Sequence, residues 1–215
     1  MSESLAARYQ GSVAAEYDRK RSGSARWRNE VTSFEAFLQA VHPARVLDCP
    51  FGTGRWIPQY DQLNASVLGV DISGDMLDKA RSKIRRVDDY RLLEGSIFDH
   101  DFAGTPVDLI VCVRFLNWVP FPDAMRAVRQ ISRAGAPCLL AGCSVIPGDA
   151  SILQRVVMRT ALALKNIFSR GGKQHVHDED RFLAAMEACS WRLKEKRFVF
   201  RNLSRQNYFY LFTRP

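Results

Sequence analysis

Two carboxylates and the glycine-containing stretch between them are the residues of this sequence best suited to ligand chemistry. The stretch VLDCPFGTG places Asp48 at the end of a short apolar run, and Gly52 and Gly54 follow it. Asp71 ends a second apolar run and lies 71 − 48 = 23 residues further along. Glycine lets backbone approach a ligand closely, and an acid at the end of a second strand accepts hydrogen bonds from ribose hydroxyls. The pattern favours a nucleotide-like cofactor, with a turn or helix-capping role for Asp71 as the plainer alternative.

The turn lacks the composition of the common dinucleotide and triphosphate sites. A dinucleotide turn reads G-x-G-x-x-G directly after the strand. Here Pro50 stands at the first expected glycine, and no third glycine follows at the required offset. The lysine of a triphosphate-binding loop is also missing from its position, since Arg55 follows Gly54 at the wrong spacing. An acid before the turn suits a cofactor that presents a positively charged amine.

Predicted strands and helices alternate along the chain in the order of a parallel sheet. Apolar runs predict strands at 44–49, 66–72, 90–96, 107–115 and 136–146, followed by two alternating strands that form a hairpin. Helices are expected at 29–41, 52–63, 122–134 and 178–190. A further helix, capped by Ser73, has the apolar face Met76, Leu77, Ala80, Ile84 and Val87. The chain is therefore predicted to be α/β with a doubly wound sheet.

Four motifs, in order, resemble those of the class I S-adenosylmethionine-dependent methyltransferases. VLDCPFGTG resembles the acid-and-glycine turn of that family, and VLGVDIS resembles its ribose-binding segment. LLEGSIFDHDF is similar to its adenine-flanking segment, and VDLIVCVRFLNWVP to the segment that leads into the substrate pocket. The resemblance covers about Tyr17 to Phe115 by motif and the terminal hairpin by architecture. It implies a Rossmann-like fold with a mostly parallel seven-stranded sheet, a C-terminal antiparallel hairpin and S-adenosylmethionine as cofactor.

The same resemblance implies a set of cofactor-binding residues. Asp71 would bind the ribose, and the backbone of Val113 and Arg114 would lie under the methionine portion. Pro50 replaces the first turn glycine, and Ser96 replaces an acid often found in the third motif, so the adenine would be recognised by hydroxyl, backbone or Asp99. The implied cofactor-binding residues are Tyr17, Asp48, Pro50, Gly52, Gly54, Asp71, Ile72, Met76, Ser96, Ile97, Val113 and Arg114.

Candidate substrate residues follow the fourth predicted strand. They are Arg114, Asn117 and Trp118, and the alternative for the last two is a loop that packs against the sheet edge. The segment RFLNWVP lacks the Asn/Asp-Pro-Pro-aromatic motif of nucleic-acid amino methyltransferases, which disfavours methylation of exocyclic base amines.

A catalytic base is required only if the acceptor must first lose a proton, because positioning alone accelerates a direct displacement. His175 and His177 are the candidates for such a base, and an exposed loop ahead of a helix is the alternative for both. The pair lacks a third ligand at convincing spacing, so no metal is expected.

One domain is expected over 1–215, with an N-terminal helical extension at 1–43 and an insertion at 147–177 that would serve as a substrate lid. The insertion contains a helical pattern with apolar residues on one half and basic residues on the other, and no acid between Ser151 and Lys173. Such a helix suits peripheral contact of 151–173 with an anionic membrane, or a cover over an apolar substrate. We expect the more common arrangement, in which the apolar half packs on the sheet and the basic half is solvated.

Composition restricts the class of protein. The 215 residues are 47% hydrophobic and 25% charged, a globular balance. The sequence shows no signal-peptide pattern and no apolar run of the roughly 20 residues that span a membrane, so a soluble, cytoplasmic protein is expected. Five scattered cysteines without a C-x-x-C pair indicate reduced core residues. The net charge of +8 is compatible with an acidic small molecule, nucleic acid or an anionic surface.

The leading hypothesis is a methyltransferase that acts on a small-molecule acceptor, apolar or anionic. An RNA methyltransferase, a transferase or lyase that uses the same cofactor for other chemistry, and a non-catalytic cofactor-binding subunit are the alternatives. The sequence specifies neither the atom that is methylated nor the oligomeric state.

Overall fold

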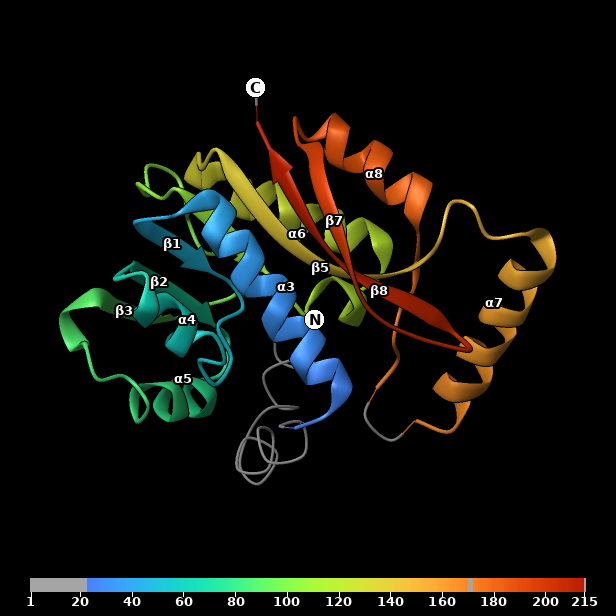
Figure 1. Ribbon diagram of the computed structural model, residues 1–215, viewed down its shortest axis with the longest axis horizontal. Helices are drawn as coiled ribbons and strands as arrows, with labels where there is room; N and C mark the ends of the chain where they lie inside the picture. Colours follow the sequence, from blue (N-terminus) through green and yellow to red (C-terminus); the bar gives the residue numbers. More distant parts are fainter. Residues whose placement is uncertain (1–22, 170–171, 215) are drawn as a thin grey trace.

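The sheet of the computed structural model, which describes residues 23–169 and 172–214, has the strand order β3-β2-β1-β4-β5-β8-β7 (Figure 1). Five strands run parallel: β1 (Arg45–Asp48), β2 (Ser66–Asp71), β3 (Tyr90–Glu94), β4 (Leu109–Cys112) and β5 (Cys138–Ile146). β8 (Arg205–Thr213) lies antiparallel between β5 and β7 (Arg192–Asn202), and the short β6 (His177–Asp178) pairs with the end of β5. The predicted doubly wound sheet with a C-terminal hairpin is confirmed.

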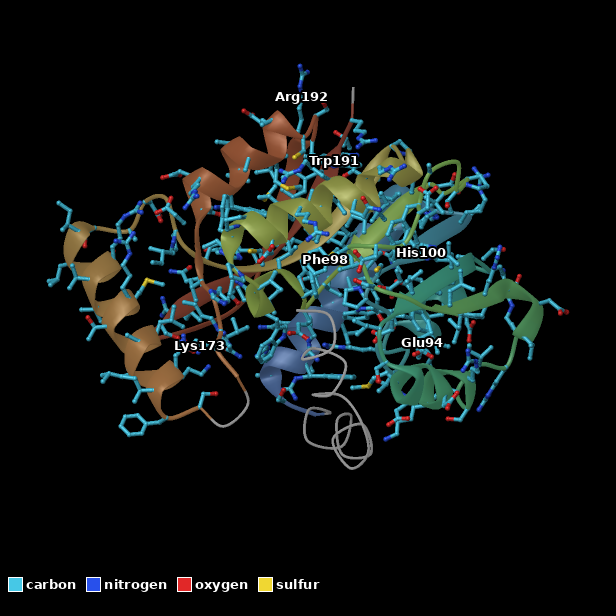
Figure 2. The ribbon with its side chains drawn as sticks, turned by 180° about the vertical axis from the view of Figure 1, so that it is seen from behind. Glu94, Phe98, His100, Lys173, Trp191 and Arg192 are labelled. Carbon is cyan, nitrogen blue, oxygen red and sulfur yellow. The ribbon has the colours of Figure 1, made fainter. Side chains whose placement is uncertain are left out.

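Helices cover both faces of this sheet, each against its own apolar cluster. α3 (Ala25–Val41), α4 (Ile57–Gln62) and α5 (Gly74–Arg81) contribute to one cluster, which includes Phe34, Tyr60 and Leu77. α6 (Phe121–Ile131) and α8 (Glu179–Ala188) contribute to the other (Figure 2). α7 (Ile152–Ile167) stands apart at the side of the sheet (Figure 1).

The register of the parallel strands brings their carboxyl ends to one edge. Asp48, the last residue of β1, pairs with Gly69 of β2 and Val111 of β4. The segments that follow β1, β2 and β4 therefore meet beside each other. The connection that follows β1 leads to β2 on one side, whereas the connection that follows β4 leads to β5 on the other. Because the two leave in opposite directions, a crevice forms at this point, as it does in other open α/β sheets.

The helix expected from Gly52 begins only at Ile57, so that prediction is wrong for its first turn. Gly52 and Gly54 have φ values of +60° and +70°. These values lie in the left-handed region, which a right-handed helix cannot include. Residues 51–56 thus form a turn that exposes backbone to the crevice before the helix starts.

The helix after β2 is shorter than its apolar pattern predicted. Ser73 is its N-cap, as expected, because its hydroxyl accepts a hydrogen bond from the Met76 N–H. The helix ends at Arg81, so Ile84 and Val87 fall outside it, and Val87 is 72% exposed. Assigning these last two residues to the helix face was wrong.

The expected orientation of the insertion helix is also wrong. We expected the apolar half of α7 to pack on the sheet, yet Ile152, Leu153 and Ile167 are 73–84% exposed. Of its sixteen residues only Met158 is buried. Among the residues described, no helix is long and apolar enough to cross a membrane.

Candidate active site

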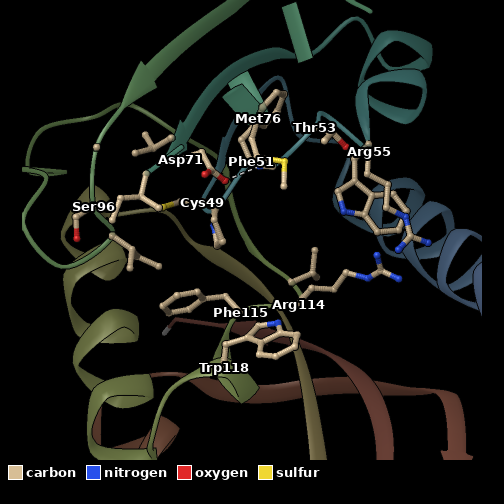
Figure 3. A pocket seen from close by; sticks show the side chains of 18 of the residues that line it. Cys49, Phe51, Thr53, Arg55, Asp71, Met76, Ser96, Arg114, Phe115 and Trp118 are labelled. Atoms are coloured by element: carbon tan, nitrogen blue, oxygen red, sulfur yellow. Dashed lines mark hydrogen bonds between the residues drawn. The ribbon is translucent and has the colours of Figure 1, made fainter. Parts of the chain in front are cut away.

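A first cavity lies at the carboxyl edge of the parallel strands (Figure 3). Its walls come from the turn after β1, the end of β2 and the segments after β3 and β4. Figure 3 places Ser96 on one side of this cavity and Arg55 on the opposite side. The cavity is lined by most of the residues implied for the cofactor: Pro50, Gly52, Asp71, Ile72, Met76, Ser96, Ile97, Val113 and Arg114.

Asp71 is the carboxylate of this cavity, and its orientation is fixed by backbone. It is 6% exposed, and its oxygens accept hydrogen bonds from the N–H groups of Gly52 at 2.7 Å and Ser73 at 3.0 Å. Burial raises the pKa of Asp71, while these N–H groups act in the opposite direction. The turn after β1 is thereby joined to the end of β2, and the carboxylate is held against the cavity.

The two glycines of the turn, Gly52 and Gly54, have different structural roles. A Cβ at Gly52 would meet nothing within 4 Å, because this residue borders the open cavity. Gly54 does not line the cavity, and a Cβ there would overlap Cδ1 of Ile57. Gly52 therefore permits a close approach to a ligand, whereas Gly54 permits the turn to pack on α4.

Asp48, like Gly54, is an implied cofactor residue that lies away from the cavity. Asp48 does not line the cavity; its Oδ2 accepts a hydrogen bond from the Tyr60 hydroxyl at 2.9 Å behind the turn. Burial raises the pKa of Asp48 well above its usual value. Contact of Asp48 with the cofactor stays a prediction, and Tyr17 lies outside the described residues.

A buried carboxylate on α3 holds three arginines beside the cavity. Glu30 is fully buried and forms ion pairs with Arg26 at 2.9 Å, Arg114 at 2.9 Å and Arg55. Burial would raise the pKa of Glu30, but the guanidinium groups of Arg114, Arg55 and Arg26 together keep it below its usual value. Three positive charges against one negative charge leave this wall of the site positive.

Aromatic rings enclose the Arg55 guanidinium. It lies 3.8 Å from the ring centre of Trp27 and 4.3 Å from that of Trp56, and the Trp56 ring stacks on Phe34. Burial lowers the pKa of Arg55 to about 10, so it remains a cation at neutral pH. The arrangement fixes a desolvated charge at one end of the first cavity.

A second cavity adjoins the first and shares Arg114 and Trp118 with it. Its chemistry is more polar than that of the first, since three guanidinium groups line it, and burial lowers the pKa of one, Arg205, to about 10. Its lining residues are Ser24, Arg26, Trp27, Arg114, Asn117, Trp118, Gly142, Ser144, Gln174, Arg205, Asn207 and Phe209. The three substrate candidates from the sequence all lie here.

Asn117 lines the second cavity and also fastens the chain around it. Its amide donates to the Ser144 and His175 carbonyls, both at 2.8 Å, and its side-chain oxygen accepts from the Ser144 N–H at 2.6 Å. The amide thus joins the segment after β4 to β5 and to the end of the insertion. This bonding accounts for the residue as a positioning group.

His175 and His177 line a different hollow, beneath α7, and neither borders the first or second cavity. The His177 ring contacts the Leu116 carbonyl at 2.8 Å and is buried. Burial lowers the pKa of both imidazoles. The structure gives neither side chain a place beside a reacting group at the two cavities.

Of the three arginines of the second cavity, Arg114 was a candidate from the sequence, but Arg26 and Arg205 were not. Arg26 and Glu30 are spaced i, i+4 on α3, behind an N-cap at Ser24 that would have extended the predicted helix. Arg205 and Asn207 share a strand face with Phe209 and Leu211. Polar residues in the inward register of an apolar strand were the available signal for a polar cavity.

Comparison with known proteins bears on this geometry. Residues 46–137 match the family model described as a methyltransferase domain. No curated protein sequence matches the chain.

Solved structures share the fold over the whole chain. Magnesium protoporphyrin IX methyltransferase from Synechocystis PCC 6803, with S-adenosylhomocysteine bound, is 16% identical, with a TM-score of 0.77 and full coverage of both chains. The 1,6-didemethyltoxoflavin-N1-methyltransferase of Burkholderia thailandensis is 14% identical, with a TM-score of 0.68, covering 100% of this chain and 90% of that one. A structure of the Haloferax volcanii Trm112 methyltransferase activator in complex with a methyltransferase matches at 13% identity and a TM-score of 0.70, covering 95% of this chain and 96% of that one.

The strand order and the crevice at the β1 edge are those of the Rossmann-like methyltransferase fold. Residues 46–137 match a methyltransferase domain, and the whole chain shares the fold of solved class I S-adenosylmethionine-dependent methyltransferases. The predictions of a methyltransferase and of S-adenosylmethionine as its cofactor are confirmed by this match.

The first cavity fits that cofactor. The open space in front of Gly52 would receive its close approach, and the Asp71 carboxylate would accept hydrogen bonds from ribose hydroxyls. Ile72 and Ile97 offer apolar surface for the adenine. Arg55 and Arg114, which border the same cavity, offer positive charge for the carboxylate of the methionine portion.

Proposed function

We propose that the protein transfers a methyl group to a small-molecule acceptor that carries an anionic group. One observation carries the proposal: Arg26, Arg114 and Arg205 line the second cavity next to the cofactor cavity. Glu30 pairs with the first two, so the positive charge there exceeds the negative charge. Guanidinium groups bind carboxylates and phosphates through two parallel hydrogen bonds, which favours such a group in the acceptor.

The side chains around the cavities suit an acceptor that needs no deprotonation. Among the described residues that line the two cavities, Asp71 is the only carboxylate and none is a histidine. When bound, S-adenosylmethionine supplies a methyl group on a positive sulfur. An oxygen that is already anionic attacks without a general base. The contribution of the chain is then to hold the acceptor in line, which is worth roughly 7–11 kcal/mol in well-oriented reactions.

The residues shared by the two cavities are suited to that positioning. Arg114 would hold the anionic group at the boundary, and the Trp118 ring would form an apolar wall beside it. Trp27 and Phe209 add aromatic surface in the second cavity, which favours an acceptor with an apolar body. Small molecules are also what the magnesium protoporphyrin IX and 1,6-didemethyltoxoflavin enzymes act on, as their names state.

A small molecule is favoured over RNA by where the charge lies. Arg205 is only 7% exposed, and Arg55 and Arg114 are largely covered, so this charge faces cavities instead of an open surface. RNA contact needs cations that reach phosphates along a surface, with a steep dependence on salt.

The test is a turnover screen with S-adenosylmethionine labelled in its methyl group. Panels of aromatic and aliphatic carboxylates and phosphate esters are each paired with their neutral methyl esters or amides. We expect S-adenosylhomocysteine to form with an anionic member and its labelled product to appear, with at least tenfold less from the neutral partner.

Other products would contradict the proposal. Methylthioadenosine would indicate a different transferase or a lyase, and binding without turnover of any panel member would favour a non-catalytic subunit. Turnover of RNA that falls steeply with salt would replace the small-molecule acceptor.

A further inference from the structure

α7 turns a wide apolar arc to solvent, and Arg155, Met158 and Asn166 face the protein. Six apolar residues of α7 and its C-cap Phe168 are exposed, seven in all, with Ile152 at 84% and Phe168 at 81%. At 100° per residue these seven fall within an arc of roughly 160°. They are Ile152, Leu153, Val156, Val157, Leu164, Ile167 and Phe168. We call this arc the outer face of α7.

Hydrogen bonds on the opposite side fix this orientation. Arg155 donates to the carbonyls of Ala150 at 3.0 Å and Gly148 at 2.7 Å, and pairs with Asp178 at 2.5 Å. Near the other end of the helix, Asn166 exchanges two hydrogen bonds with the backbone of Gln174, at 2.8 and 2.9 Å. The helix cannot roll its outer face inward without losing these bonds at both ends. The apolar arc is therefore a stable outward surface of the fold.

Basic residues border the outer face on both sides. On the helical wheel Arg159 lies beside Ile152, and Lys165 lies beyond Phe168 at the other edge; both are exposed. From Ser151 to Ser169 the sequence has three basic residues and no acidic one. An apolar arc with cationic edges is the arrangement of helices that lie in a membrane interface, where the edges meet lipid phosphates.

The turn between β7 and β8 extends this surface. Figures 1 and 2 both show it beside α7, and Gln174 Oε1 accepts hydrogen bonds from Lys165 of the helix and from Arg205 at the start of β8. Leu203 in the turn is 79% exposed, and Arg201, two residues earlier at the end of β7, is also exposed. The turn thus repeats the combination of an apolar and a basic residue.

We propose that α7 docks on a membrane surface that bears anionic phospholipids, with its outer face among the acyl chains and its edges at the phosphates. The charge favours this occupant over a second copy of the chain, since two such helices would face each other with cations at both edges and no acid between them. Gln174 lines the second cavity and is bonded to α7, so docking would bring that cavity close to the lipid surface. The inference does not depend on which acceptor is methylated.

The test is co-sedimentation of the full chain with vesicles of phosphatidylcholine alone and of phosphatidylcholine mixed with phosphatidylglycerol. We expect binding to the mixed vesicles and little binding to the neutral ones. The double variant Leu164→Ser with Ile167→Ser should bind the mixed vesicles about tenfold more weakly, because each substitution removes an apolar side chain that docking would bury. Arg159→Glu should weaken binding to the mixed vesicles alone.

Val87→Ser is the matched control, because Val87 is 72% exposed and belongs to the segment before β3. It should bind vesicles as the parent does, and all variants should keep the parent's unfolding temperature. Failure of the parent to bind the mixed vesicles, or equal binding by the outer-face variants, would overturn the proposal. So would a parent that sediments as a dimer without binding vesicles and becomes a monomer in the Leu164/Ile167 variant.

Discussion

The two cavities share a wall but are built in different ways. The first is formed by segments that directly follow β1, β2, β3 and β4, and much of its contact surface is backbone and apolar side chain. The second is formed by side chains from α3, the segment after β4, β5, Gln174 and β8. The local geometry of the sheet edge would thus bind the cofactor common to the class. The features particular to this chain come from residues far apart in sequence.

The charged groups of the two cavities are also held in place in different ways. The first cavity contains a carboxylate, Asp71, whose orientation is set by backbone N–H groups. The second has guanidinium groups whose positions are set by another side chain, Glu30, and by aromatic rings. A single side-chain substitution should therefore alter the second cavity more broadly than the first.

Glu30→Gln tests whether one carboxylate organises the arginine wall. The variant leaves three clustered guanidinium groups without their negative partner, so the free energy of unfolding should fall by about 3–5 kcal/mol at neutral pH. The folded-state pKa of Glu30 is lowered, so its stabilisation is present above the ordinary glutamate value of 4.5 and is lost as the pH falls below it. Urea unfolding at neutral and acidic pH would show the difference shrinking.

The control for this variant is Glu35→Gln on the same helix, whose carboxylate accepts a hydrogen bond from Gln59 at 3.1 Å. It should change stability by less than about 1 kcal/mol. If the two variants lose equal stability, the wall does not depend on Glu30.

The turn glycines offer a matched pair within the first cavity. Gly54→Ala forces a methyl group into Ile57 at a left-handed backbone, and should lower the free energy of unfolding by about 2–4 kcal/mol. Gly52→Ala faces open space, so it should lose only about 1 kcal/mol of stability. Calorimetric titration should show a larger loss of S-adenosylmethionine affinity for Gly52→Ala than for Gly54→Ala. The reverse order would mean that the cofactor does not approach Gly52.

Asp71→Ala tests the cofactor site itself. Loss of charged hydrogen bonds and of the link between Gly52 and Ser73 should weaken S-adenosylmethionine binding roughly a hundredfold. Asp78→Ala is the control, because Asp78 is an exposed carboxylate on the adjacent helix, paired with Arg81. Titration calorimetry on both variants gives the comparison, and unchanged binding by Asp71→Ala would show that the site is assigned wrongly.

Arg205→Gln is the mildest change and concerns the second cavity alone. With an anionic acceptor found by the turnover screen, KM for the acceptor should rise roughly tenfold, while the affinity for S-adenosylmethionine stays the same. Arg201→Gln, exposed on the same hairpin, should leave both values unchanged. A rise in the cofactor dissociation constant with no change in KM would place Arg205 in the wrong cavity.

The first cavity could be predicted from the sequence to a greater extent than the second. The apolar strands, the turn at Gly52 and the acid at Asp71 lie within one continuous stretch, so short-range patterns could locate most of the cofactor cavity. Arg26, Arg114 and Arg205 come together only because three elements pack against one another: α3, β8 and the segment that follows β4. Short-range sequence patterns do not indicate this packing. The α7 helix was predicted correctly as an element, but not its orientation. Apolar periodicity identifies an apolar helix face, but it does not indicate whether that face packs against the rest of the protein or against a membrane.

Arg114 has a consequence for the order of events at the site. It borders both cavities, has a left-handed backbone with φ of +64°, and is paired with Glu30. A ligand in either cavity acts on the same cation, so each ligand must change the affinity for the other by the same factor. S-adenosylmethionine and S-adenosylhomocysteine differ in charge at the sulfur, and with the cofactor in the first cavity Arg114 would feel this difference. Methyl transfer would therefore change the electrostatic field at Arg114. Release of the methylated product would then depend on whether the cofactor still carries its positive charge.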